Sequence, residues 1–304
     1  RVILPFFYCF GPSLLHTHLR VGGSLALCNS FTFPETALDM LEQNACTGFA
    51  GVPSSYQLLL RLSSFAKREL PSLRLMQQAG GKLHSVLLKE LAASKPKARI
   101  FVMYGQTEAT ARLSYLPPER LADKMGSIGK GIPGVELRVL REDGSPVSPG
   151  EVGEIVAKGG NISPGYLDNP EATAEKFSGG TLRTGDLATV DEDGFIFVVD
   201  RKDDFIKSWG YRVSSQEVES CVLELKDVVS AAAVGVPDLE AGESIQVFAS
   251  LRPGTGLTTD QMIAHCRERL AKYMVPKKVT SVDSLPLNSN GKVVKSELRK
   301  LASS

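Results

Sequence analysis

The sequence predicts an α/β protein in three successive parts: a largely parallel sheet, a small antiparallel barrel-like part and a compact α+β domain. Apolar strand-like runs alternate with helix-like segments over residues 1–115 and again after a charged segment at 200–204. Between them, short strands are separated by Gly and Pro turns. Strands that alternate with helices of this length form parallel sheets. We therefore place the predicted boundaries at 1–115, 116–202 and 203–304, with the last part able to move independently.

The elements follow in order from these runs. Strands are predicted at 2–7, 24–27, 48–52, 73–76 and 100–103, and helices at 34–44, 54–61 and 83–93. In the middle part, turns with Gly at 142–144 and 191–194 predict two hairpins. In the last part, the alternation covers 213–224, 228–236, 246–251 and 259–272, and a short helix follows Lys292.

Composition excludes several classes of protein. The 304 residues include 35 Lys and Arg against 34 Asp and Glu, so no bulk charge favours nucleic acid or an anionic membrane. No apolar run reaches the length of a membrane span. Five cysteines without a Cys-x-x-Cys pair indicate a reduced, cytoplasmic setting. His16 and His18, read as one face of a strand, have no neighbouring carboxylate or thiol, which disfavours a metal site.

Four motifs carry residue types suited to chemistry. Tyr104-Gly105-Gln106-Thr107-Glu108 follows a strand, Gly80-Gly81 follows another, Leu182–Asp186 ends on a Gly turn, and Asn290-Gly291-Lys292 is a tight turn near the end. Taken singly, each also fits a purely structural interpretation, such as a helix cap or a solvated turn. Their shared order is more specific than any one motif.

In order and spacing, these motifs resemble the adenylate-forming superfamily, which includes acyl-CoA synthetases, peptide-synthetase adenylation domains and firefly luciferase. The resemblance is closest to AMP-forming acyl-CoA ligases and covers the later part of the family's length. It implies an incomplete large AMP-binding domain over 1–115, a β-rich subdomain over 116–202 and a C-terminal lid domain over 203–304.

The resemblance implies ATP-binding roles for the first two motifs. The Tyr104 ring stacks on the purine, the Thr107 hydroxyl donates to a phosphate, and the Glu108 carboxylate ligates Mg²⁺, a cation that prefers oxygen. Gly80 and Gly81 let the backbone pass along the edge of adenine.

The later motifs are implied to complete the reaction. Asp186 and Arg201 bind the ribose, and Lys292 bridges the substrate carboxylate and the α-phosphate. Asp203 is the hinge between two half-reactions, and Gly210 lies along the pantetheine tunnel.

The substrate is expected to be a fatty or aromatic carboxylic acid. Tyr8 and Gly105 are implied to line its pocket, and the apolar neighbours of Tyr8 carry no charge that could pair with an amino acid's ammonium. CoA is the expected acceptor. Two alternatives stay open: an adenylation enzyme that loads a free carrier protein, and a catalytically silent fragment that binds partners.

The family's Ser/Thr/Gly-rich loop, which holds the β- and γ-phosphates, has no counterpart in these residues. The chain is therefore expected to be part of a longer polypeptide and to be inactive alone.

Overall fold

A computed structural model describes residues 3–28, 31 and 33–303 of the chain. The chain forms two compact units, which are described separately. The first comprises 1–53, 69–83 and 95–199, and the second comprises 54–68, 84–94 and 200–304. Among the described helices, none is long and apolar enough to cross a membrane.

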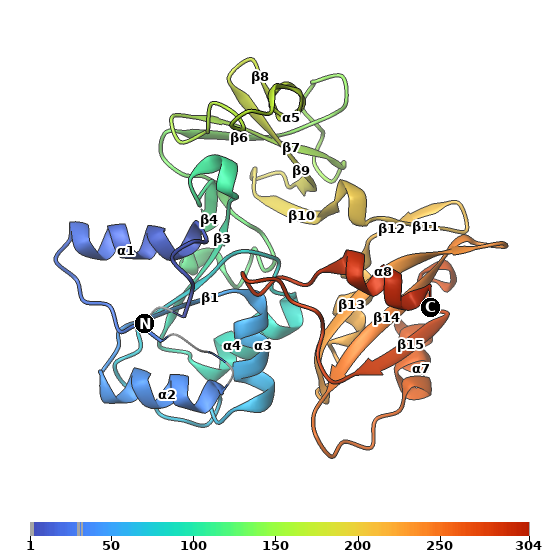
Figure 1. Ribbon diagram of the computed structural model, residues 1–304, viewed down its shortest axis with the longest axis horizontal. Helices are drawn as coiled ribbons and strands as arrows, with labels where there is room; N and C mark the ends of the chain where they lie inside the picture. The colour runs from blue at the N-terminus through green and yellow to red at the C-terminus, as the bar shows by residue number, and fades with distance from the viewer. Residues whose placement is uncertain (1–2, 29–30, 32, 304) are drawn as a thin grey trace. The chain divides into compact units, whose positions relative to one another are not determined.

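The first sheet has the order β1-β2-β3-β4-β5 (Figure 1). Its first three strands are parallel, whereas the last two are antiparallel to their neighbours, and buried apolar side chains such as Phe49, Met76 and Ile100 anchor the parallel part. The prediction of a largely parallel sheet is thus confirmed. The strands are β1 Gly48–Gly51, β2 Leu75–Gln78, β3 Arg99–Tyr104, β4 Ser114–Leu116 and β5 Lys130–Gly131, and α2 Pro34–Gln43 precedes β1.

The start of the chain differs from the prediction. Residues 3–7 form turns instead of a strand, and residue 2 lies outside the described residues. Helix α1, Phe10–Arg20, follows, so His16 and His18 lie on a helix and not on a strand. The turn closes tightly because Gly11 has no Cβ, which would lie 2.2 Å from the Pro5 carbonyl oxygen. The predicted strand at 24–27 is also wrong, since these residues contribute an isolated bridge position at most.

The second sheet is antiparallel in its printed pairings and has the order β10-β9-β7-β6, with β8 added to β9 (Figure 1). Both predicted hairpin turns are present, with Gly144 and Gly194 at positive φ, and the Asp191 carboxylate accepts the Phe195 N–H. The barrel-like prediction is confirmed. The elements are β6 Val135–Leu140, β7 Gly153–Gly159, α5 Pro170–Lys176, β8 Phe177–Ser178, β9 Thr181–Val190 and β10 Ile196–Arg201.

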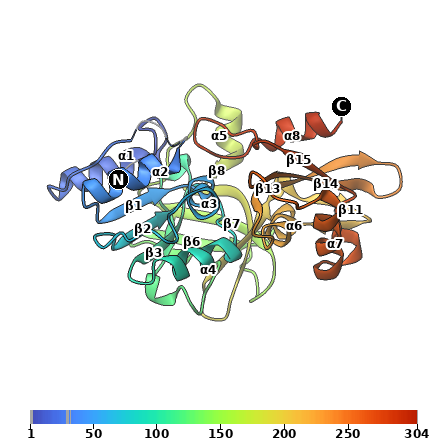
Figure 2. The same cartoon turned by 90° about the horizontal axis from the view of Figure 1, so that it is seen from below.

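The third sheet, with the order β12-β11-β14-β13 and β15 parallel to β14, lies in the second unit. Ala232 and Val234, alternate residues of β13, pack together with Phe248 of β14 against Leu298 of α8. Figure 2 shows α8 on one side of this sheet and α6 and α7 on the other. The elements are β11 Ile206–Ser208, β12 Tyr211–Val213, α6 Ser215–Val222, β13 Val228–Asp238, β14 Gly242–Leu251, α7 Thr259–Arg269, β15 Lys278–Val282 and α8 Lys295–Ala302.

Two helices from earlier in the chain, α3 Pro53–Leu62 and α4 Ser85–Ser94, also belong to this unit. Arg61 of α3 is buried and forms an ion pair with Glu90 of α4. The same guanidinium donates to the carbonyl oxygens of Leu223 and Val228, at 3.5 and 3.2 Å. One arginine thus satisfies backbone acceptors at the end of α6 and the start of β13.

Two leucines on α8 provide a matched test of this packing. Leu298 is fully buried, whereas Leu301 is 59% exposed. We expect Leu298→Ala to lower the free energy of unfolding by about 2–5 kcal/mol, because it leaves a cavity against β13 and β14. Leu301→Ala should change it by less than about 0.5 kcal/mol. Denaturant unfolding of both variants, with hydrogen exchange to locate the loss to the third sheet, checks this; equal effects would contradict the packing.

Candidate functional site

The motif after β3 forms a tight loop at the carboxyl end of that strand. A Cβ on Gly105 would lie 2.1 Å from the Ala111 carbonyl oxygen, so only glycine fits there. Thr107–Ala109 forms a short 3₁₀ turn, and Thr110 and Ala111 both have positive φ. Non-glycine residues in this region are strained and concentrate at functional sites. The loop is therefore fixed by crowding of its backbone.

Tyr104 and Asp186 lie together, although 82 residues separate them. The Tyr104 hydroxyl donates to Asp186 Oδ2 at 2.6 Å, and the Asp186 side chain is buried on β9. Thr184 fixes the backbone at Asp186, because its Oγ1 accepts the Asp186 N–H and donates to the Ile155 carbonyl. Two residues assigned separately to adenine and ribose thus form one polar pair, which the sequence did not predict.

Glu108 has a partner that the sequence interpretation missed. The Tyr166 hydroxyl donates to Glu108 Oε1 at 2.7 Å, and the Ser163 N–H donates to the Glu108 carbonyl. Burial, followed by the bond to Glu108, raises the pKa of Tyr166 to about 12, so the phenol stays a donor near neutral pH. Tyr166 ends the sequence Ser-Pro-Gly-Tyr. An aromatic residue in such a turn is the only signal in the sequence that could have indicated its role.

The Gly80-Gly81 loop packs against Tyr8. Gly80 has a φ of +88°, and a Cβ there would lie 2.7 Å from the Tyr8 hydroxyl oxygen and 3.0 Å from Val52. Burial, with a smaller effect from Cys9, raises the pKa of Tyr8 to about 12, so this side chain is neutral. Lys82, the next residue, donates to the Val198 carbonyl at 2.8 Å.

Two buried amides in these loops fit a site that a bound molecule completes. Gln78 Nε2 donates to the Gly81 carbonyl, but Gln78 Oε1 has no hydrogen-bond partner among the described residues. Gln106 Nε2 is likewise buried without a partner in the described part of the chain. Buried polar atoms are rarely left unsatisfied in native proteins. Together with the carboxylate and hydroxyl oxygens of Glu108 and Thr107, these atoms suit a polar ligand with a hard cation.

The remaining predicted residues lie in the second unit. Lys292 is exposed in a turn in which Asn288 Oδ1 accepts its N–H, and the neighbouring Gly291 carbonyl accepts from Ser54 Oγ at 2.9 Å. Arg201 ends β10, and Asp203 lies in the 3₁₀ turn that follows.

Gly210 follows Trp209 in the hairpin between β11 and β12, and both residues have positive φ. A Cβ on Gly210 would meet no described atom within 4 Å. The backbone conformation alone therefore explains glycine there.

Two family descriptions match the chain. "AMP-binding enzyme" matches residues 2–167, and "AMP-binding enzyme C-terminal domain" matches residues 217–292. Among curated relatives, a 2-succinylbenzoate–CoA ligase of Geobacillus kaustophilus (strain HTA426) is 36% identical over 299 residues, covering 98% of this chain and 60% of that protein. A feruloyl-CoA synthase of Amycolatopsis sp is 36% identical over 302 residues, with the same coverage of both chains. The chain thus spans about 60% of the length of these relatives.

Solved structures agree with this fold. An anthranilate CoA ligase, AuaEII, in complex with anthranoyl-AMP superposes with a TM-score of 0.91 at 29% identity, covering 99% of this chain and 58% of that one. The o-succinylbenzoate CoA synthetase MenE of Bacillus subtilis, in complex with ATP and magnesium ion, has a TM-score of 0.83 at 30% identity, covering 98% and 60%.

The contact between Gly80 and Tyr8 can be tested by a double-mutant cycle. We expect Gly80→Ala to destabilise the protein by roughly 1–3 kcal/mol, because it combines a positive φ with a clash against the Tyr8 hydroxyl. In a Tyr8→Phe background that oxygen is absent, so the loss should be smaller. Gly81→Ala is the control, since its φ is not positive and its Cβ would be 3.3 Å from Pro53. Thermal unfolding measures all four variants; the same loss in both backgrounds contradicts the clash.

Proposed function

We propose, from the premise that this chain belongs to the AMP-binding enzyme family, that it takes part in ATP-dependent activation of a carboxylic acid. The acid and ATP give an acyl-adenylate and pyrophosphate, and CoA then accepts the acyl group as a thioester. The pairing of Tyr104 with Asp186 carries this proposal on the side of geometry, since it joins two separate motifs at one polar position. The names of the relatives support CoA as acceptor.

Binding of ATP is assigned to residues of the first unit together with Arg201 of the second. A fixed carboxylate such as Asp186 accepts hydrogen bonds from both ribose hydroxyls, while Tyr104 holds it in place and offers its ring to adenine. Arg201 completes the ribose contacts. Thr107 donates to a phosphate, and Gly80 and Gly81 admit the edge of the base.

Magnesium is assigned to Glu108, whose carboxylate is a hard oxygen ligand oriented by Tyr166. The cation would screen the phosphate charges. Within the protein, the raised pKa of Tyr166 keeps its phenol protonated, so it stays a hydrogen-bond donor to Glu108 throughout the physiological range.

Stabilisation of the negative charge that develops on the reacting phosphate is assigned to Lys292. Lys292 is exposed, and its backbone is held in a turn in which Asn288 Oδ1 accepts the N–H groups of Asn290 and Lys292. The side chain is proposed to reach the bound substrate while the turn keeps these hydrogen bonds. An ammonium placed where negative charge develops stabilises the transition state more than the ground state. Asp203 is the proposed hinge, and Gly210 is proposed to lie along the path of the thiol arm.

The acid is proposed to be aromatic or fatty. Tyr8 is buried and neutral and packs in an apolar cluster with Phe10, Leu14 and Met103. The relatives named for feruloyl, succinylbenzoate and anthranilate groups favour the aromatic class. The cysteine pattern and the use of ATP and CoA favour a cytoplasmic location.

A free carrier protein as acceptor remains the alternative, and a thiol-exchange assay with CoA and a phosphopantetheine carrier distinguishes the two. A silent fragment is the remaining possibility. It predicts no adenylate from any acid in the intact protein.

Neutralising Asp186 should weaken ATP binding. Asp186→Asn removes the charge from the proposed ribose contacts, and charge-assisted hydrogen bonds contribute about 1.5–3 kcal/mol each, so affinity should fall by roughly 10- to 100-fold. Glu192→Gln, an exposed carboxylate in the next turn of the same hairpin, is the control. Calorimetry on the intact protein gives both affinities. Wild-type affinity in Asp186→Asn would remove this residue from the nucleotide site.

Removing Lys292 should affect one half-reaction. In the intact protein, Lys292→Ala should slow adenylate formation by roughly 10²-fold, the scale of one lost electrostatic contact to the transition state. Thioester formation from supplied acyl-adenylate should persist. Lys278→Ala, an exposed lysine on β15, is the matched control. Equal losses in the two half-reactions would refute the assignment.

A further inference from the structure

Strand β9 is irregular at the position of Asp186. In its antiparallel pairing with β7, the register shifts between Glu154 and Val156. The segment 184–186 of β9 therefore lies opposite a single residue of β7, Ile155. Bulges of this kind bend a strand, change the direction of its side chains and are frequent next to functional sites. The bulge thus sets the direction of the Asp186 carboxylate.

Two side chains satisfy the backbone donors of the bulge. Thr184 Oγ1 accepts the Asp186 N–H at 3.2 Å, and Glu154 Oε1 accepts the Gly185 N–H at 3.1 Å. Gly185 has a φ of +78°, a conformation that glycine adopts without strain but that its free backbone can also leave. The hydrogen bond from Gly185 to Glu154 therefore restrains the most flexible residue of the bulge.

The Glu154 carboxylate is itself fixed. Arg183 Nη2 donates to Glu154 Oε2, while Oε1 accepts the Gly185 N–H, so each carboxylate oxygen has its own donor. The Glu154 side chain is only 11% exposed. Charge-assisted hydrogen bonds at both oxygens hold the carboxylate in one orientation.

Glu154 and Asp186 lie on opposite faces of the sheet. Ile155 and Ala188 pack in one core cluster, and side chains alternate along a strand, so Asp186 points to the core side and Glu154 to the other. On the core side, the Tyr104 hydroxyl donates to Asp186 Oδ2 at 2.6 Å. Glu154 thus acts on Asp186 through the backbone of the bulge, from behind the proposed ribose contacts.

We propose that Glu154 is a positioning residue for Asp186 and thereby determines how strongly the nucleotide site prefers ribose to 2′-deoxyribose. This inference rests on the proposed function, in which Asp186 accepts both ribose hydroxyls. Hydrogen bonds weaken steeply when donor and acceptor are misaligned, so a carboxylate on a relaxed bulge no longer meets both hydroxyls well. Loss of Glu154 therefore weakens binding of ATP more than binding of 2′-deoxy-ATP, which lacks one of these hydroxyls.

The test compares Glu154→Ala with Glu151→Ala. Glu151 is the matched control, because its carboxylate also pairs with an arginine, Arg141, and accepts a backbone N–H, that of Ser148 at 2.9 Å. Calorimetry on the intact protein gives the affinities for ATP and 2′-deoxy-ATP, and hydrogen exchange follows the Gly185 amide. We expect Glu154→Ala to lower the ratio of the two affinities at least about threefold and to speed exchange at Gly185. Glu151→Ala should change neither.

Two further variants identify the route of the effect. The amide oxygen of Glu154→Gln still accepts the Gly185 N–H, so this variant should recover part of the ratio. In an Asp186→Asn background, Glu154→Ala should lower the ratio no further, because its effect passes through Asp186.

Two results overturn the proposal. One is a wild-type ratio in Glu154→Ala, and the other is an equal loss of both affinities with a lower melting temperature, as a plain structural brace would give. If Asp186→Asn itself keeps the wild-type ratio, the ribose assignment in the proposed function fails. Exchange at Gly185 then decides by itself whether Glu154 holds the bulge.

Discussion

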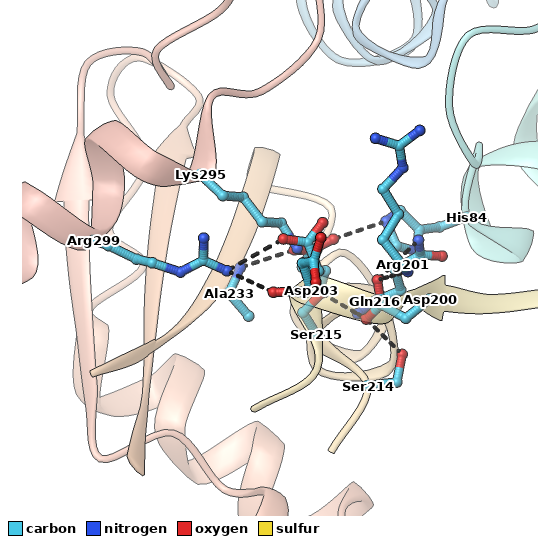
Figure 3. Close-up of polar contacts among 12 residues, drawn as sticks. His84, Asp200, Arg201, Asp203, Ser214, Ser215, Gln216, Ala233, Lys295 and Arg299 are labelled. Carbon is cyan, nitrogen blue, oxygen red and sulfur yellow. Dashed lines mark hydrogen bonds and ion pairs between the residues drawn. The ribbon is translucent and has the colours of Figure 1, made fainter. Parts of the chain in front are cut away.

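A single buried charge organises the second unit. Glu219 on α6 accepts the Ala233 N–H of β13 and pairs with Lys295 of α8, so one carboxylate joins elements on both faces of the third sheet. Because its pKa lies well below the ordinary value of 4.5, the pair adds stability above that pH and loses it as the pH falls toward 2. Removing one partner would leave the other charge buried and unpaired, which is costlier than never having had the pair. The packing of α8 and its contacts to Asp203 and Asp204 depend on this arrangement (Figure 3).

The first unit is held by a different constraint. Two of its loops depend on close contacts at glycine: the Ala111 backbone approaches Gly105, and the Tyr8 side chain approaches Gly80. Such contacts respond to neither salt nor pH. The Gly80 and Gly105 loops are thus held by steric contacts, whereas residues 200–204 are held by charged and polar groups.

The sequence predicted what local periodicity controls. Helices α2 and α4 and strands β1 and β3 fall within about two residues of their expected ranges, and both Gly turns are present. The predicted strand at 73–76 began too early, because the Leu73 N–H bonds the Leu70 carbonyl in a turn. The N-terminal run was misread because apolar residues alone do not distinguish a strand from a turn around Pro5. Pairs such as Tyr104 with Asp186 could not be predicted, since only the folded chain brings such distant residues together.

The crowding at Gly105 also bears on how this chain would change over generations. Every amino-acid replacement there introduces a Cβ 2.1 Å from the Ala111 oxygen, so selection for folding alone removes it, whether or not any reaction is catalysed. Lys292 is exposed, so replacing it creates no clash of this kind. Lineages that had abandoned catalysis would keep the glycine and let the lysine drift. Invariance of Gly105 among descendants would consequently say nothing about chemistry, whereas invariance of Lys292 would be a record of it.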